Sequence, residues 1–393
     1  MLGVLRRRDF GLLWTAGLVS VAGDWVLAAA LPFFVYERTG STVATAGMIA
    51  AELAPGALLG PAAGVFADRW SRKRLLVGAN VLQAGLVLLL ALVAHGAALW
   101  LVYVVAAATA GVAAFSVPAE SALLPSLVEP ELLIQANSLN ALNNRLGRLL
   151  GVPAGGMLLG CLGLDAVVLV DASSFLAAAA LVAVISARPV LSEPVVATPS
   201  FRSELRDGLQ LVRRQRAIAV VFAVLGLMTF GGTMLDPLQV AWVRDVLGQG
   251  PQVFAWLTTT HAASGIVGSL VVGHRGRGLT PRTLMGVSSV VAGLALLVKF
   301  NVPLLWLAFA LSALGGATSV ASAIGVETLV QQQVPDAYRG RVFGSLGATL
   351  SLLSLCGAIA GGALGELFGT VAMLNVAAVL VAVSGFVVLR AVA

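Results

Sequence analysis

Carboxyl groups inside apolar segments are the residues of this sequence most able to do chemistry. Asp24 and Glu52 each lie near the middle of a long apolar run. A carboxyl group in such surroundings tends to hold a proton and to release it when water or a cation arrives, which proton coupling requires. We therefore expect Asp24 to be a proton-coupling group, with Glu52 assisting; a hydrogen-bonded structural acid is the alternative. Asp236 is a weaker candidate because it could cap a helix broken at Pro237, and Asp171 is expected to be structural.

A second set of polar residues recurs at helical spacing in the run 136–160. The set is Asn137, Asn140, Asn144 and Arg148. These positions fall on one stripe of a helix, and an arginine facing lipid is costly, so the stripe should face protein or an aqueous cavity. We expect it to line a substrate cavity, with Arg148 seeking Asp24, Glu52 or Glu120. A packing stripe joined by side-chain amides is the alternative.

The sequence lacks the residues expected for ATP hydrolysis, metal binding or enzyme catalysis. An ATP-driven pump needs a Gly-Lys-Ser/Thr phosphate loop, but Lys73 is followed by Arg74 and Lys299 by Phe300. The three histidines are scattered, and no catalytic groups cluster at one depth. We therefore expect no catalytic residue, metal, cofactor or nucleotide, and a protein that is not an enzyme. Energy would then come from an ion gradient, the solute's own gradient or a partner.

The elements that position these residues are transmembrane helices. Apolar residues make up 59% of the 393 residues and charged residues 11%, against about 25% charged in soluble domains. A hydrocarbon core of ~30 Å needs about 20 apolar residues per helix. Twelve runs meet that length: 10–36, 42–66, 74–95, 98–119, 136–160, 165–187, 217–242, 252–273, 283–300, 303–326, 341–364 and 368–390. The sequence thus predicts an all-α integral membrane protein with twelve spans.

Basic residues predict the orientation of these spans. Nineteen arginines and lysines fall at the ends on the side of the N-terminus and three at the opposite ends. The positive-inside rule then places both termini in the cytoplasm of a cell with an inner or plasma membrane. The net charge of +6 is accounted for by this bias, so we expect no nucleic-acid partner. Trp100, Trp242, Trp256 and Trp306 fall near the expected outer ends, where indole rings favour the interface.

An internal repeat divides the chain. Leu149–Gly163 resembles Leu355–Gly369 at an offset of 206 residues, in corresponding spans of the same orientation. This predicts two parallel six-helix halves, 1–187 and 217–393, related by an axis along the membrane normal. The segment 188–216 between them is expected to form an amphipathic helix on the cytoplasmic surface, or else an ordinary solvated linker. Glycines of both copies should allow close helix approach: Gly151, Gly155, Gly156, Gly357, Gly361 and Gly362.

The loop after the second span carries a recognisable motif. It reads Gly64-Val-Phe-Ala-Asp68-Arg69-Trp-Ser-Arg72-Lys73-Arg74. This resembles the cytoplasmic-loop signature of the major facilitator superfamily, with serine in place of the second glycine. The resemblance implies that Asp68 contacts the end of span 11 and holds an inner gate closed, while Arg72 and Lys73 also set topology. The corresponding loop after span 8 has no aspartate, so gating should differ between the halves.

Further resemblances suggest the kind of cargo. Gly151-Val-Pro153-Ala-Gly155-Gly156 is similar to the glycine-proline motif in span 5 of exporting members, with Val152 separating the usual pair. The runs around Leu124-Pro125 and Val334-Pro335 resemble the branch with macrolide and siderophore exporters and lysophospholipid flippases. The resemblance implies a monomeric proton antiporter that exports amphipathic small molecules by alternating access. A lysophospholipid flippase, an uptake symporter and a membrane-embedded enzyme or non-transporting sensor are the alternatives.

Overall fold

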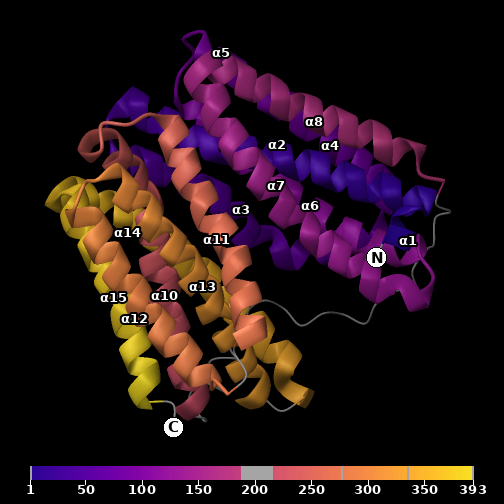
Figure 1. The fold of residues 1–393 in the computed structure, drawn as a ribbon. Helices are drawn as coiled ribbons and strands as arrows, with labels where there is room; N and C mark the ends of the chain where they lie inside the picture. Colours follow the sequence, from indigo (N-terminus) through magenta and orange to yellow (C-terminus); the bar gives the residue numbers. More distant parts are fainter. Residues whose placement is uncertain (1, 187–215, 276–277, 334–335, 392–393) are drawn as a thin grey trace. The chain divides into compact units, whose positions relative to one another are not determined.

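The computed structural model describes residues 2–186, 216–275, 278–333 and 336–391 (Figure 1). Within these ranges the chain is helical and contains no strand, and twelve long helices are formed. Nine helices of the described part are long and apolar enough to cross a membrane. The predicted all-α transmembrane fold is confirmed. The segment expected to form the amphipathic linker helix lies outside the described residues, except for its last residue.

The N-terminal helices follow the predicted runs closely. They are α1 (Leu2–Leu5), α2 (Arg8–Thr39), α3 (Thr42–Arg69), α4 (Arg72–Leu88), α5 (Leu90–Ala94), α6 (Trp100–Leu123), the short 3-10 turns η1 (Leu124–Ser126) and η2 (Pro130–Leu132), α7 (Leu133–Leu162) and α8 (Leu164–Val184). The third predicted span is made of α4 and α5, which meet at Leu89.

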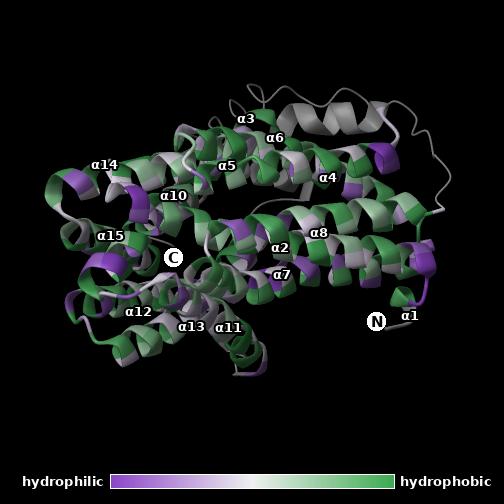
Figure 2. Ribbon diagram, turned by 90° about the horizontal axis from the view of Figure 1, so that it is seen from above, coloured by the Kyte–Doolittle hydropathy of each residue, from purple (hydrophilic) through white to green (hydrophobic). Residues whose placement is uncertain are grey.

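The C-terminal helices continue the same pattern. They are α10 (Arg216–Ala241), the π-helical turn η3 (Trp242–Val246), α11 (Pro251–Arg275), α12 (Pro281–Asn301), α13 (Leu305–Gln333), α14 (Asp336–Phe368) and α15 (Thr370–Ala391). Most of their length is coloured as hydrophobic in Figure 2, as a lipid-facing bundle requires. Large apolar side chains such as Leu270, Leu367 and Trp306 are exposed.

The chain forms two compact units. One holds the described residues up to Val35 and those from Ala51 to 186, and the other holds Tyr36–Ala50 with the described residues from Arg216 onwards. The end of α2 and the start of α3 thus pack with the C-terminal helices, although the predicted halves assign them to the N-terminal six.

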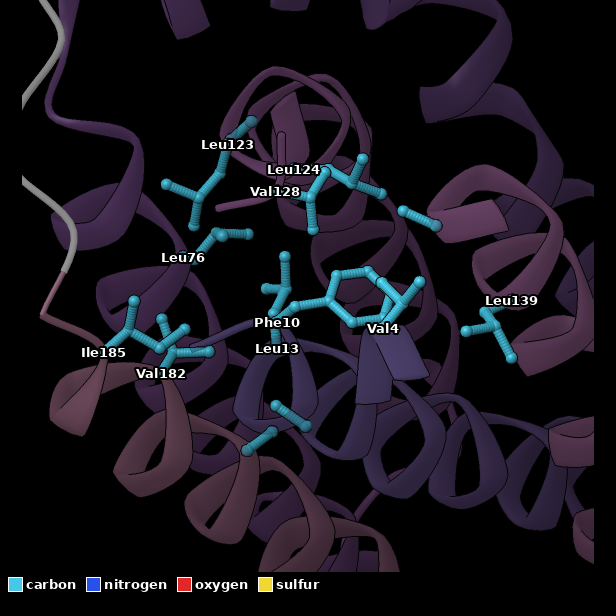
Figure 3. Packing of buried hydrophobic residues seen from close by; sticks show 14 residues of the cluster. Val4, Phe10, Leu13, Leu76, Leu123, Leu124, Val128, Leu139, Val182 and Ile185 are labelled. Atoms are coloured by element: carbon cyan, nitrogen blue, oxygen red, sulfur yellow. The ribbon is translucent and has the colours of Figure 1, made fainter. Parts of the chain in front are cut away.

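In the first unit, the helix ends near the N-terminus share an apolar core (Figure 3). It gathers Val4 of α1, Phe10 of α2, Leu76 of α4, Leu139 of α7 and Ile185 after α8, all buried. Burial of aromatic and aliphatic side chains from five segments fixes these ends against one another. Arg7 and Glu129 form an ion pair of 2.8 Å on the surface of this unit.

Glycines bring α7 against α2. A Cβ atom at Gly151 would lie 2.3 Å from the carbonyl oxygen of Ala22, and one at Gly155 would lie 2.3 Å from that of Val26. Real side chains do not approach a backbone this closely, so only glycine permits the contact. The two backbones therefore touch directly along this face.

The second unit repeats this contact between α14 and α10. A Cβ atom at Gly357 would lie 2.6 Å from the carbonyl oxygen of Phe230, and one at Gly361 would lie 2.4 Å from that of Met234. The two glycines follow Gly151 and Gly155 by the repeat offset of 206 residues. The repeat seen in the sequence is therefore also a repeat in packing.

The tryptophans expected at the outer ends divide into two groups. Trp100, Trp256 and Trp306 are exposed, as interface residues should be. Trp242 is fully buried, so the prediction for this residue is wrong. It opens the π-helical turn η3, and its ring packs edge-on against Phe300 with centroids 5.3 Å apart. Its indole nitrogen donates to the Phe300 carbonyl oxygen at 3.3 Å, which satisfies the polar atom inside the unit.

Candidate functional site

The two carboxyl groups expected to couple protons both lie in the first unit. Asp24 lies on α2 and Glu52 on α3, and both side chains are exposed. The Glu52 carboxyl group acts electrostatically on that of Asp24. An exposed carboxyl group in the middle of a span needs water or polar partners beside it, because lipid offers neither.

The polar stripe of α7 lies in the same unit. Asn137 and Asn144 are exposed, whereas Asn140 and Arg148 are half-buried. The Asn140 side chain hydrogen bonds the Glu120 carboxyl group of α6. The asparagines thus present amides on the accessible face of this unit.

Arg148 lies against α2. Its guanidinium carbon is 4.8 Å from the centre of the Trp25 ring, and Trp25 directly follows Asp24 in the chain. Such a cation–π contact is worth about 0.5–2 kcal/mol, more where water is excluded. The contact thus places the positive charge of Arg148 beside the residue that follows Asp24 on α2.

Asn143 is a polar residue that the stripe analysis missed. It is buried, and its amide nitrogen donates to the carbonyl oxygen of Trp14 at 2.9 Å. The Trp14 indole nitrogen returns a bond to the Leu139 carbonyl oxygen at 2.8 Å. Asn143 lies four residues before Gly147 on the glycine face of α7, and this register could have identified it as a helix–helix contact.

The basic residues of the loop motif bind helix ends. Arg72 Nη1 donates to the Ala122 carbonyl oxygen at 2.7 Å, at the end of α6, and Lys73 Nζ donates to the Ile185 carbonyl oxygen at 2.6 Å, at the end of α8. Cations at C-terminal carbonyl groups satisfy orphan acceptors and complement the helix dipole. Gly64, Asp68 and Arg69 belong to α3, but their side chains lie outside the described ones.

The remaining predicted site residues lie on both units. Asp236 is exposed on α10 of the second unit, and the helix continues through Pro237 to Ala241, so Asp236 does not cap a break there. Pro153 lies within α7, and the neighbouring Gly156 is buried. In the part of the chain that the structure covers, no three His, Cys, Asp or Glu side chains gather as a metal site would need.

The start of α3 is bound by α14 in the second unit. Glu366 Oε2 accepts from Ser41 Oγ at 2.6 Å and from the Val43 amide at 3.3 Å. Thr42 Oγ1 donates to the Gly362 carbonyl oxygen at 2.8 Å, and a Cβ atom at Gly362 would lie 2.6 Å from the Thr42 carbonyl oxygen. A carboxylate at a helix N-terminus satisfies free amides. The sequence alone did not reveal this contact, because the partners are 323–325 residues apart.

Comparison with known proteins settles what these helices belong to. The family model described as transmembrane secretion effector matches residues 1–392. This chain belongs to that family of major facilitator superfamily transporters. It is therefore a multi-pass membrane transporter and not an enzyme.

Relatives cover most of the chain at low identity. Macrolide efflux protein A of Streptococcus pyogenes is 27% identical over 356 residues, which cover 89% of this chain and 87% of the relative. Enterobactin exporter EntS of Citrobacter koseri is 27% identical over 380 residues, covering 93% and 88%.

Solved structures share the fold. Nucleoside transporter NupG (a D323A mutant) has a TM-score of 0.80 at 12% identity, covering 97% of this chain and 98% of that chain. A bacterial homologue of the iron transporter ferroportin, in an inward-facing state, has a TM-score of 0.74 at 18% identity, covering 98% and 99%. The major facilitator fold predicted from the loop motif and the repeat is thereby confirmed.

Proposed function

We propose that this transporter exports amphipathic small molecules from the cytoplasm in exchange for protons. Its family is described as transmembrane secretion effectors. Two relatives are named for macrolide efflux and for enterobactin export. The cargo class proposed for this chain follows from these names and from its mixed polar and apolar surface on α7.

The observation that carries the proton-coupling proposal is the exposure of Asp24 and Glu52 in the middle of their helices. Exposure to lipid would be costly for an anion, so these groups should face a water-accessible passage. A carboxyl group there can take a proton from the outer side and exchange it for the solute. Moving one charge through 100 mV supplies about 2.3 kcal/mol, enough for roughly fifty-fold accumulation.

The polar residues of α7 would hold the solute. Asn137, Asn140 and Asn144 offer amide donors and acceptors, and Arg148 stacked on Trp25 offers a cation beside an aromatic surface. Alternating access would expose this surface to each side of the membrane in turn, with the Asp68 loop motif closing the inner side. Both termini would lie in the cytoplasm, and the transporter would act as a monomer in the plasma membrane.

A reconstituted system tests this proposal. Liposomes holding the purified protein and an internal pH dye are given an imposed pH gradient and radiolabelled erythromycin as the probe. Antiport predicts macrolide accumulation that follows the gradient, together with proton movement in the opposite direction. Accumulation that ignores the gradient would remove proton coupling from the proposal.

Two variants and a second probe sharpen the result. Asp24→Asn should abolish gradient-driven accumulation, whereas Asp9→Asn makes the same change in the first turn of α2 and should leave it intact. An Asp24→Asn protein that still responds to the gradient would exclude Asp24 from coupling. A fluorescent lysophospholipid distinguishes the runner-up, since its movement between leaflets without macrolide movement would indicate a flippase.

A further inference from the structure

A third carboxyl group, Asp171 on α8, is buried beside the Asp24 region. Asp171 is 0% exposed, and neither of its carboxylate oxygens has a hydrogen-bond partner. An unpartnered buried carboxylate is costly, whereas the same group carrying a proton is far less so. Ser174, three residues further along α8, is the side-chain hydrogen-bond donor beside this carboxyl group.

The backbone of α2 makes room for this carboxyl group. A Cβ atom at Gly23 would lie 2.6 Å from Asp171 Oδ1 and 2.0 Å from Ser174 Oγ. Glycine therefore allows the Asp171 carboxyl group to reach α2 one residue before Asp24. Ser174 Oγ donates to the backbone carbonyl oxygen of Asp171 at 2.7 Å and also lies beside the Asp171 carboxyl group.

The charges around this place are few. Asp24 acts electrostatically on Asp171, and Glu52 of α3 acts on Asp24. Arg148 of α7 lies over Trp25, and Glu120 of α6 hydrogen bonds Asn140. From Leu75 to its end, α4, which packs along α8, carries no acidic or basic residue. Among these groups, Asp24 is the one that acts on Asp171, and it follows the glycine that the Asp171 carboxyl group approaches.

We propose that Asp24 and Asp171 form a carboxyl pair that holds one proton between them. Asp171 is the member of the pair that solvent does not reach. Two neighbouring carboxyl groups resist being ionised together, so the first proton is held by the pair. The exposed Asp24 exchanges protons with water. Transfer to Asp171 converts Asp24 from acid to anion and Asp171 from anion to acid, and no other reactant is needed. The pair deepens the proposed antiport, on which its role in transport rests, by giving the proton a site that solvent does not reach.

Infrared titration of the reconstituted full-length protein tests the pair without any substrate. The carbonyl stretch of protonated carboxyl groups is followed with pH in the wild type, Asp24→Asn, Asp171→Asn and the double variant. A pair predicts non-additive spectra: removal of either carboxyl group changes the titration of the other, and two coupled steps become one. Asp165→Asn, the same change in the first turn of α8, should leave both steps in place.

The result that would overturn the pair is additivity. If the spectral changes of the two single variants sum to those of the double variant, Asp24 and Asp171 titrate independently. Should Asp171→Asn fail to fold, Asp24→Asn alone decides, because coupling is reciprocal: an unchanged Asp171 step there refutes the pair. Loss of proton-driven macrolide transport is a separate result, since antiport can fail while the pair still titrates.

Discussion

Adding one methyl group to the glycine face of α7 should loosen the first unit. The change is Gly155→Ala. Its Cβ atom would lie 2.3 Å from the Val26 carbonyl oxygen, where contacts below 3.0 Å are essentially never found. The atom in the way belongs to the backbone of α2, which cannot rotate aside as a side chain would. The α7 backbone must therefore retreat from α2.

The size of the effect follows from a comparison with an open position. Overpacking of this kind costs about 1–3 kcal/mol. A Cβ atom at Gly78 of α4 would meet nothing within 4 Å, so Gly78→Ala should stabilise its helix by about 0.5–1 kcal/mol. The two variants, each adding one methyl group to a helical glycine, should differ in stability by about 1.5–4 kcal/mol.

Thermal unfolding of the purified protein in detergent, scanned at one rate, measures this difference. At roughly 2 °C per kcal/mol, Gly155→Ala should unfold about 3–8 °C below Gly78→Ala. Gly361→Ala, with its Cβ atom 2.4 Å from the Met234 carbonyl oxygen, should behave like Gly155→Ala. Equal unfolding temperatures for Gly155→Ala and Gly78→Ala would refute the reasoning that backbone contact requires these glycines.

Three further predictions test contacts outside the glycine faces. Lys73→Met removes the charged donor on α4 that binds the Ile185 carbonyl oxygen at the end of α8. It should lower the free energy of unfolding by about 1.5 kcal/mol and so lower the unfolding temperature; an unchanged temperature would contradict the contact. Glu366→Gln weakens the acceptor of the Val43 amide, so hydrogen exchange at Val43 should become faster; an unchanged rate would contradict the contact. Cys161, exposed near the end of α7, should react with an impermeant maleimide on intact cells carrying Cys356→Ser. Reaction only after permeabilisation would reverse the proposed orientation.

The fold could be read from the sequence because its signals are local or repeated. Apolar runs of span length, the loop motif and the 206-residue repeat each constrain the chain without knowledge of long-range contacts. The glycines of the repeat mark close helix approach for the same reason, since only a missing side chain allows two backbones to touch.

The site was less predictable because its contacts join distant parts of the chain. Asp24 stands out as an acid in an apolar run. Its proposed pairing with Asp171 depends on the missing side chain at Gly23, which lets the Asp171 carboxyl group reach α2, and no residue spacing indicates this contact. Trp242 was expected at the interface because hydropathy places it at a helix end, whereas it is buried at the start of the π-helical turn η3. The binding of Ser41 and Val43 by Glu366 likewise depends on which helix ends meet.

Contact through glycine also affects how each pair of helices can move. Interlocked side chains resist the movement of one helix past another, because a shift requires them to repack into the next set of grooves. The facing surfaces of α7 and α2, and of α14 and α10, are smooth at their glycines, because backbone atoms meet there without side chains between them. Such surfaces can slide by small amounts while they stay in contact. Each unit thus has a helix–helix contact that permits small sliding movements, between its first and fifth long helices and at equivalent places in the repeat.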